Sequence, residues 1–158
     1  MNTKVNVRWS NQVKFITVLV TILLISTEVG LIYNGASGLI IISIALVFFV
    51  FMLSAPLSIT LSDSKLILNK VFGKITINYS QIYLVKPYNP ASGDIRVFGS
   101  GGFGGYVGIF SNQEIGQYFS YVGDPKQAFL IRTKNGKNYV FSCENMAFII
   151  ETVKKYLP

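Results

Sequence analysis

The chain has 158 residues, of which 51% are hydrophobic and 13% charged, and its formal net charge is +7 at pH 7. A soluble domain usually carries about 25% charged residues, so this composition excludes an ordinary water-soluble protein. The apolar excess lies within residues 15–57, whereas the residues from Ser58 onward alternate apolar and polar types. We therefore expect two parts: residues 1–57, with a basic segment and a transmembrane helical hairpin, and residues 58–158, which suffice for one compact domain.

Two apolar runs predict the transmembrane hairpin. Residues 15–33 would span about 28 Å as a helix, close to the hydrocarbon thickness of a bilayer. Residues 38–57 contain no charge, and residues 34–37 between the two runs are long enough only for a turn. Basic residues precede the first run and follow the second, but the turn has none. The positive-inside rule therefore predicts a multi-pass protein with both termini in the cytoplasm.

Two features of the first run have an alternative interpretation. A basic stretch before an apolar run also fits a cleavable signal peptide, but this run is longer than a typical signal-peptide core and no clear A-x-A site follows it. Glu28 is the one ionisable residue inside either run, and a carboxylate in a membrane can mark an ion path. Because Glu28 lies near the outer end of the helix, it can instead reach the headgroup region.

The residues after the second run predict short strands joined by turns. The expected strands cover residues 57–62, 65–70, 74–80, 95–98, 117–121, 128–133 and 138–142, with 82–85 extending or following the third. The first three form an antiparallel meander. Asn135 and Gly136 join the last two strands, and Asn-Gly is the dipeptide that best tolerates the two positive φ angles of a type I′ turn. Apolar residues at helical spacing between Met146 and Leu157 predict an amphipathic C-terminal helix.

About seven strands and one C-terminal helix have the outline of a pleckstrin-homology (PH) barrel, in which the helix covers the open end of a bent sheet. Residues 96–110, 115–119, 128–137 and 141–148 resemble the bacterial PH-like domain family of small membrane proteins. The resemblance extends over most of residues 56–157, and members carry a short helical hairpin before the domain. It implies an α+β protein of the bacterial inner (cytoplasmic) membrane, with a mainly antiparallel β barrel after the transmembrane hairpin.

A segment rich in glycine and aromatic residues, 98–119, is the most distinctive part of this resemblance. Residues 99–104 match the pattern G-x-G-x-x-G, but no helical period follows them, so we do not expect nucleotide binding there. We interpret residues 98–110 of this segment as a mobile or sharply turned loop whose aromatic side chains pack on the barrel or dip toward the bilayer. The candidate interaction residues are Phe98, Phe103, Tyr106 and Phe110.

Catalysis is not expected from this residue inventory. The chain has no histidine, which excludes catalytic triads with an imidazole base and zinc sites that contain histidine. The carboxylates after Ser58 show no spacing typical of a metal site or an acid–base pair. Cys143 is the single cysteine, cannot form an intrachain disulfide, and is interpreted as an inert structural residue. We expect neither a cofactor nor a metal.

Two functions fit these features. The preferred one is a non-catalytic, membrane-anchored interaction module that binds a protein partner or lipid headgroups at the inner membrane face. Its expected partners are membrane lipids and a protein or further copies of the chain, but no nucleic acid polymer. The alternative is an oligomeric transmembrane effector or channel that is gated by a small anionic ligand, such as a cyclic nucleotide, bound to the cytoplasmic domain. The candidate anion or lipid contacts are Arg132, Lys134 and Lys137, around the Asn-Gly turn.

Overall fold

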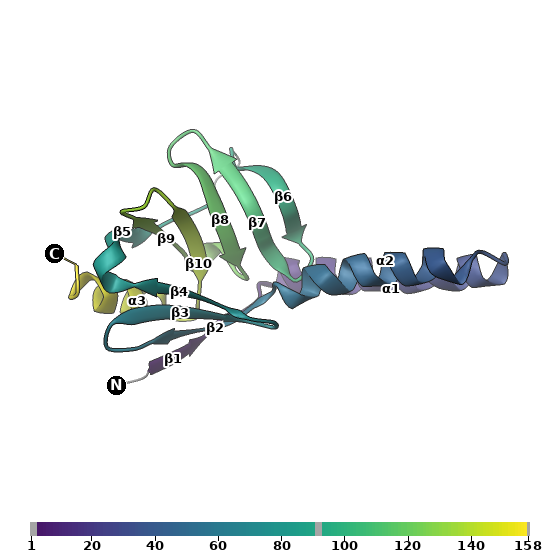
Figure 1. The fold of residues 1–158 in the computed structure, drawn as a ribbon, viewed down its shortest axis with the longest axis horizontal. Helices are drawn as coiled ribbons and strands as arrows, with labels where there is room; N and C mark the ends of the chain where they lie inside the picture. The colour runs from purple at the N-terminus through teal and green to yellow at the C-terminus, as the bar shows by residue number, and fades with distance from the viewer. Residues whose placement is uncertain (1–2, 91–92, 158) are drawn as a thin grey trace.

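The structure is a computed structural model that describes residues 3–90 and 93–157. A hairpin of two helices, α1 (Asn11–Tyr33) and α2 (Gly38–Leu53), projects from a sheet domain (Figure 1). The first and last elements of the chain, β1 (Thr3–Asn6) and α3 (Met146–Lys154), both belong to the sheet domain and lie away from the free end of the helical hairpin (Figure 1). Ser10 caps α1, because its Oγ accepts a hydrogen bond from the backbone N–H of Val13 at 3.2 Å.

The sheet domain contains two sheets and a C-terminal helix. The first sheet has the strand order β1 (Thr3–Asn6), β2 (Pro56–Leu61), β3 (Lys65–Lys70) and β4 (Lys74–Asn78). The second has the order β5 (Ile82–Pro87), β9 (Ala128–Thr133), β10 (Asn138–Ser142), β8 (Gly116–Val122), β7 (Gly105–Asn112) and β6 (Ile95–Gly102). Short 3₁₀ turns, Tyr79–Gln81 and Pro125–Gln127, precede β5 and β9, and α3 (Met146–Lys154) follows β10. All strand pairs are antiparallel except β10 with β8, which is parallel.

The two sheets are not closed into a barrel, which corrects the prediction from the sequence. Closure would need hydrogen bonds between the edge strands of the two sheets, β4 with β5 and β1 with β6, and neither pair is formed in the described part of the chain. Between β4 and β5 the turn Tyr79–Gln81 takes the chain from one sheet into the other. The buried face of α3, with Ile149, Ile150 and Val153, packs into a core shared by both sheets. The domain is therefore an α+β structure with two sandwich-like sheets and a helix that covers the opening between them.

Residues of the six-stranded sheet alternate between two hydrophobic clusters. The main cluster lies between the sheets and α3, and Phe129 and Ile131 of β9 belong to it together with Ile59 of β2. Leu130, which points to the opposite face of β9, joins a second cluster around Tyr118. Because both faces of β9 are covered, its sequence reads as an almost continuous apolar run.

Most strands confirm the expected positions, and three differences have local causes. The prediction missed β1, because four residues with three polar side chains give too short a pattern. The apolar run after residue 38 ends as a helix at Leu53, and Pro56 already begins β2. The β9–β10 hairpin is confirmed, but its turn is not type I′, since only Gly136 has a positive φ (+79°). Gly136 completes a longer loop in which the N–H of Thr133 donates to the carbonyl of Lys137.

The glycine-rich segment is a β-hairpin, and its interpretation as a mobile loop was wrong. Residues 95–112 form β6 and β7, with Phe103 and Gly104 at the turn between them. Gly99 and Gly108 lie opposite each other and have φ of +114° and +137°. A Cβ on Gly108 would lie 2.1 Å from the carbonyl oxygen of Phe98. The glycines therefore permit the close strand pairing, although glycine itself is a weak signal for a strand.

We expect Gly108→Ala to lower the free energy of unfolding by about 2 kcal/mol or more, because the added Cβ meets backbone and the positive φ disfavours any L side chain. Gly101→Ala is the matched control in the same hairpin. Its Cβ would meet only the movable end of Arg96, and its φ is not positive. Thermal unfolding of the two variants in the same detergent measures the difference. Equal midpoints would mean that the Gly99–Gly108 contact is not a constraint on the fold.

Cys143 lies directly after β10, is 1% exposed and belongs to the main cluster. Burial raises the pKa of its thiol to about 11, because the thiolate would lose its hydration. At neutral pH the reactive thiolate is therefore a very small fraction of a side chain that reagents cannot reach.

We expect alkylation of Cys143 in the native protein to be slow at neutral pH and fast after unfolding by a denaturant. Labelling with a maleimide, followed by mass spectrometry, measures both rates. The rate in the folded protein should rise as the pH approaches the raised pKa, since the thiolate fraction rises with it. Rapid labelling of the folded chain at pH 7 would contradict a structural role.

Candidate functional site

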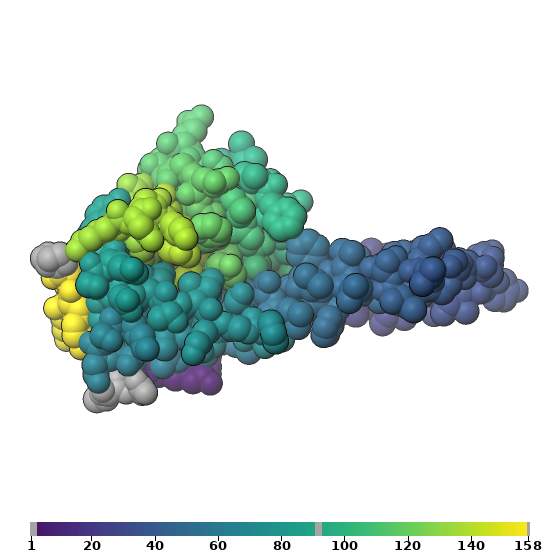
Figure 2. All heavy atoms as spheres, viewed as in Figure 1, coloured from purple at the N-terminus to yellow at the C-terminus, as the bar shows by residue number. Residues whose placement is uncertain are grey.

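The two long helices expose apolar side chains over most of their length. Within residues 11–33 and 38–53 the one buried residue is Val13, at the start of α1. By length and composition alone, α1 with its 23 residues can cross a membrane. The shorter α2 is also apolar and has 16 residues. In Figure 2 the helices stand out from the sheet domain and no part of that domain covers the side in view.

The C-terminal end of α2 is hydrogen-bonded to the β3–β4 turn. Ser54 and Ala55 are the only residues between α2 and β2, so the connection has no flexible linker. In the β3–β4 turn, the N–H of Phe72 donates to the carbonyl of Leu53 at 2.8 Å, and the N–H of Val71 donates to the carbonyl of Ala55 at 3.0 Å. These backbone bonds satisfy carbonyl groups at the end of a helix and hold the turn beside it.

The β6–β7 hairpin contacts both helices, α1 through a hydrogen bond at its tip and α2 through aromatic rings. The backbone N–H of Gly104 donates to Oγ1 of Thr17 on α1 at 3.0 Å. A Cβ on Gly102 would lie 2.7 Å from Cδ1 of Ile16, so a glycine there permits the close approach of the two elements. Two pairs of rings join the hairpin to α2, Phe103 with Phe48 at 5.7 Å and Phe98 with Phe51 at 6.4 Å between centroids.

The structure separates the four candidate aromatic residues into two groups. Phe98 is 66% exposed and Phe103 is partly buried, and both rings lie against α2. Tyr106 packs against the second cluster, and Phe110 is a buried member of it, stacked on Tyr118 at 5.9 Å between centroids. Phe98 and Phe103 thus share a surface at the base of the helices, whereas Phe110 belongs to the core.

The three candidate basic residues lie far from that surface. Lys134 and Lys137 are exposed in the β9–β10 turn, at the end of the domain away from the helices (Figure 1). Arg132 donates from Nη2 to the carbonyl of Glu114 at 3.3 Å. The Glu114 carboxylate is bonded to Lys86 at 2.8 Å. Lys86, and to a smaller degree Arg132, hold the pKa of Glu114 below its usual value, so the charge of Arg132 already has an acidic neighbour.

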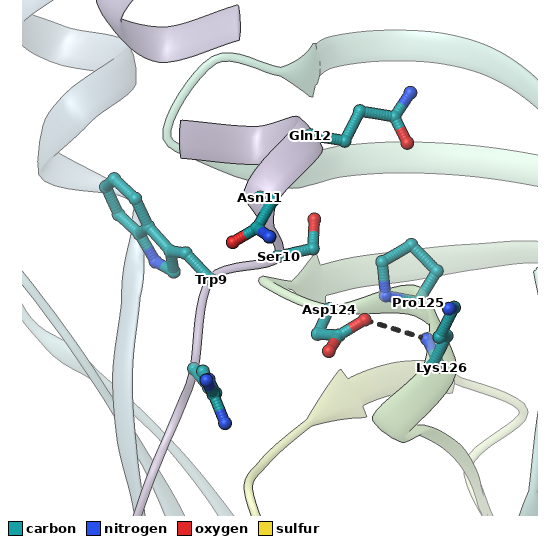
Figure 3. A pocket seen from close by; sticks show the side chains of 8 residues that line it. Trp9, Ser10, Asn11, Gln12, Asp124, Pro125 and Lys126 are labelled. Atoms are coloured by element: carbon teal, nitrogen blue, oxygen red, sulfur yellow. Dashed lines mark hydrogen bonds between the residues drawn. The ribbon is translucent and has the colours of Figure 1, made fainter. Parts of the chain in front are cut away.

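A cavity of about 440 Å³ lies where the chain enters α1 (Figure 3). Its lining residues are Arg8, Trp9, Ser10, Asn11, Gln12, Asp124, Pro125 and Lys126. Figure 3 shows the carboxylate of Asp124 directed to the backbone N–H of Lys126, which donates to it at 3.1 Å. The sequence alone does not reveal this cavity, because its two walls are more than a hundred residues apart in the chain. The cavity lies between the N-terminal segment and the β8–β9 connection. Its lining residues include no pair of groups suited to acid–base chemistry.

A second cavity, of about 320 Å³, has Asp94 and Tyr118 in its wall. The Asp94 carboxylate accepts hydrogen bonds from the hydroxyls of Tyr88 and Tyr118 at 3.0 and 2.9 Å, and from the Asn112 amide at 2.7 Å. Burial, and then the bond to Asp94, raise the pKa of both tyrosines, so they remain neutral donors. This arrangement holds the start of β6 onto β7 and β8. Among residues 3–90 and 93–157, no group of three or more His, Cys, Asp and Glu could hold a metal.

Comparison with known proteins agrees with this domain architecture. The family model described as "Bacterial PH domain" matches residues 57–156, which extend from β2 past α3 and form more than half of the chain. No curated protein and no solved structure matches. PH-like domains are in general non-catalytic interaction modules. On the strength of this match, the chain belongs to the bacterial PH domain family.

Proposed function

We propose that the chain is a non-catalytic interaction module that α1 and α2 anchor in the membrane. The observation that carries the proposal is the exposed apolar surface of both helices. Leaving apolar surface in water costs about 25 cal/mol for each Å², and a bilayer removes this cost. Because β1 before the hairpin and β2 after it are paired in one sheet, a hairpin that crosses twice returns to the side on which it began (Figure 1).

The charge distribution supports a cytoplasmic position for the domain. Basic residues precede the first apolar run and follow the second, whereas the turn between the helices has none. These flanking residues are Lys4, Arg8, Lys14, Lys65, Lys70 and Lys74. We infer a bacterial inner-membrane protein whose termini and sheet domain face the cytoplasm and whose turn at residues 34–37 faces the other side.

The position of two turns at the base of the helices favours binding of the domain to lipid headgroups at the inner membrane face. The β3–β4 turn and the β6–β7 tip are bonded to the base of the helices, so both must lie at the membrane surface if the helices cross it. Lys70 and Lys74 flank the first of these turns and can approach anionic headgroups. A protein partner can reach the opposite end of the domain, where Lys134 and Lys137 are exposed.

The positions of the three candidate basic residues do not support the alternative function, a channel that is gated by an anion. Arg132 contacts Glu114 instead of sharing a pocket with Lys134 and Lys137. The two lysines lie in a turn that is remote from the helices, so nothing in their position couples an anion to a pore. We therefore favour the interaction module.

We expect the turn between the helices and the sheet domain to be on opposite sides of the membrane. Ser37→Cys, in the turn, should react with a membrane-impermeant maleimide in intact spheroplasts but not from the inside of the cell. Ser64→Cys, in the exposed β2–β3 turn, should react only in inverted vesicles. The unmodified chain is the control, since its buried Cys143 should stay unlabelled in both. Labelling of both positions from one side would contradict the membrane hairpin.

A further inference from the structure

The short length of α2 places part of the sheet domain inside the membrane interface. This inference rests on the proposed function and specifies how the domain meets the bilayer. The 16 residues of α2 span about 24 Å, whereas a bilayer's hydrocarbon core is about 30 Å thick. The turn at residues 34–37 holds the outer ends of both helices close together. The inner end of α2 at Leu53 therefore falls short of the inner hydrocarbon boundary, and other parts of the chain must fill the difference.

The tip of the β6–β7 hairpin lies beside the helices, whereas the β3–β4 turn lies at the inner end of α2, where the N–H of Phe72 donates to the carbonyl of Leu53. Phe103 packs on Phe48, which precedes the end of α2 by five residues, or about 7 Å along the helix. Gly104 is bonded to Thr17, which lies about 9 Å along α1 from its first residue. The tip of the β6–β7 hairpin is thus level with the inner turns of both helices.

Large apolar side chains of these two segments are exposed. The membrane-facing patch consists of Val71 and Phe72 in the β3–β4 turn and Ile95, Val97 and Phe98 on β6. Phe72 is 72% exposed and Phe98 is 66% exposed. A bulge between Arg96 and Phe98 interrupts the alternation of β6, which leaves the neighbours Val97 and Phe98 both exposed. Figure 1 shows β6 on the side of the domain from which the helices leave.

The charges around the membrane-facing patch suit an anionic lipid surface. Lys70 and Lys74 flank Phe72 in the chain, and the exposed Arg96 precedes Val97. The nearest acidic residue in the chain, Asp94, has its carboxylate occupied by two tyrosine hydroxyls and the Asn112 amide. Long basic side chains can lie along apolar surface while their charged ends reach phosphate groups.

We propose that the membrane-facing patch inserts into the cytoplasmic leaflet of the bilayer that α1 and α2 cross. Phe72 and Phe98 are its apolar anchors, and Lys70, Lys74 and Arg96 contact lipid phosphates. The inserted side chains fill the part of the hydrocarbon core that the short helix α2 does not reach. The insertion also holds the domain in one orientation. It also covers β6, the edge strand of the six-stranded sheet, against pairing with another sheet.

Spin labels on the full-length chain test this proposal in vesicles of phosphatidylethanolamine and phosphatidylglycerol. Phe72→Cys and Phe98→Cys carry the label in the membrane-facing patch. Leu46→Cys, at an exposed position of α2, is the reference in the membrane, and Tyr83→Cys, at an exposed position of β5, is the reference in water. The buried Cys143 should not take up the label. Power saturation with oxygen and with a water-soluble nickel chelate measures the immersion of each label.

The expected result is a several-fold higher ratio of oxygen to nickel collisions at positions 72 and 98 than at position 83. A ratio at 72 and 98 equal to that at 83, while position 46 is immersed, overturns the insertion and leaves the membrane hairpin standing. A label at 46 that behaves like the label at 83 overturns both. Protection of position 98 from both reagents means that a second copy or another protein covers β6, which also overturns the insertion. Circular dichroism of each variant verifies that it is folded.

Discussion

Backbone contacts between the sheet domain and its two helices, among them the hydrogen bond from the Gly104 N–H to Thr17 Oγ1, hold the domain in one orientation on the helices. This hydrogen bond fixes the tip of the β6–β7 hairpin against α1, and the backbone bond from Phe72 to Leu53 fixes the β3–β4 turn against α2. Both contacts require backbone to approach a helix closely. Gly102 has a φ of +131°, which disfavours any L side chain, and a Cβ there would also meet the side chain of Ile16.

The helical hairpin also continues the pairing of two neighbouring strands. β1 and β2 are antiparallel partners, β1 leads into α1, and α2 leads into β2. The N–H of Val7 extends this ladder by donating to the carbonyl of Leu57 at 2.8 Å. α1 therefore follows, and α2 precedes, one of two neighbouring strands of the same sheet. This origin makes the orientation of the domain a property of the fold and not of a linker.

Polar interactions in the domain are mostly structural. Asp94 binds two tyrosine hydroxyls and an amide, and Glu114 binds Lys86, so each of these carboxylates has partners within the domain. Arg132 donates a hydrogen bond to the backbone carbonyl of Glu114. What distinguishes the surface is instead its apolar residues, which gather where the helices leave. This distribution fits a module whose main interaction is with a membrane better than one that binds a small polar ligand.

Local signals in the sequence determined the apolar runs of both helices, most of the strands, the last hairpin and the C-terminal helix α3. These signals are periodicity and turn residues, which act over a few neighbours in the chain. Only the tertiary structure decided that the strands form two open sheets, that 98–110 belongs to a hairpin, and that Phe110 lies in the core while Phe98 faces outward. Strand pairing and burial depend on partners distant in the chain, and glycines that permit a close pairing read locally as a loop.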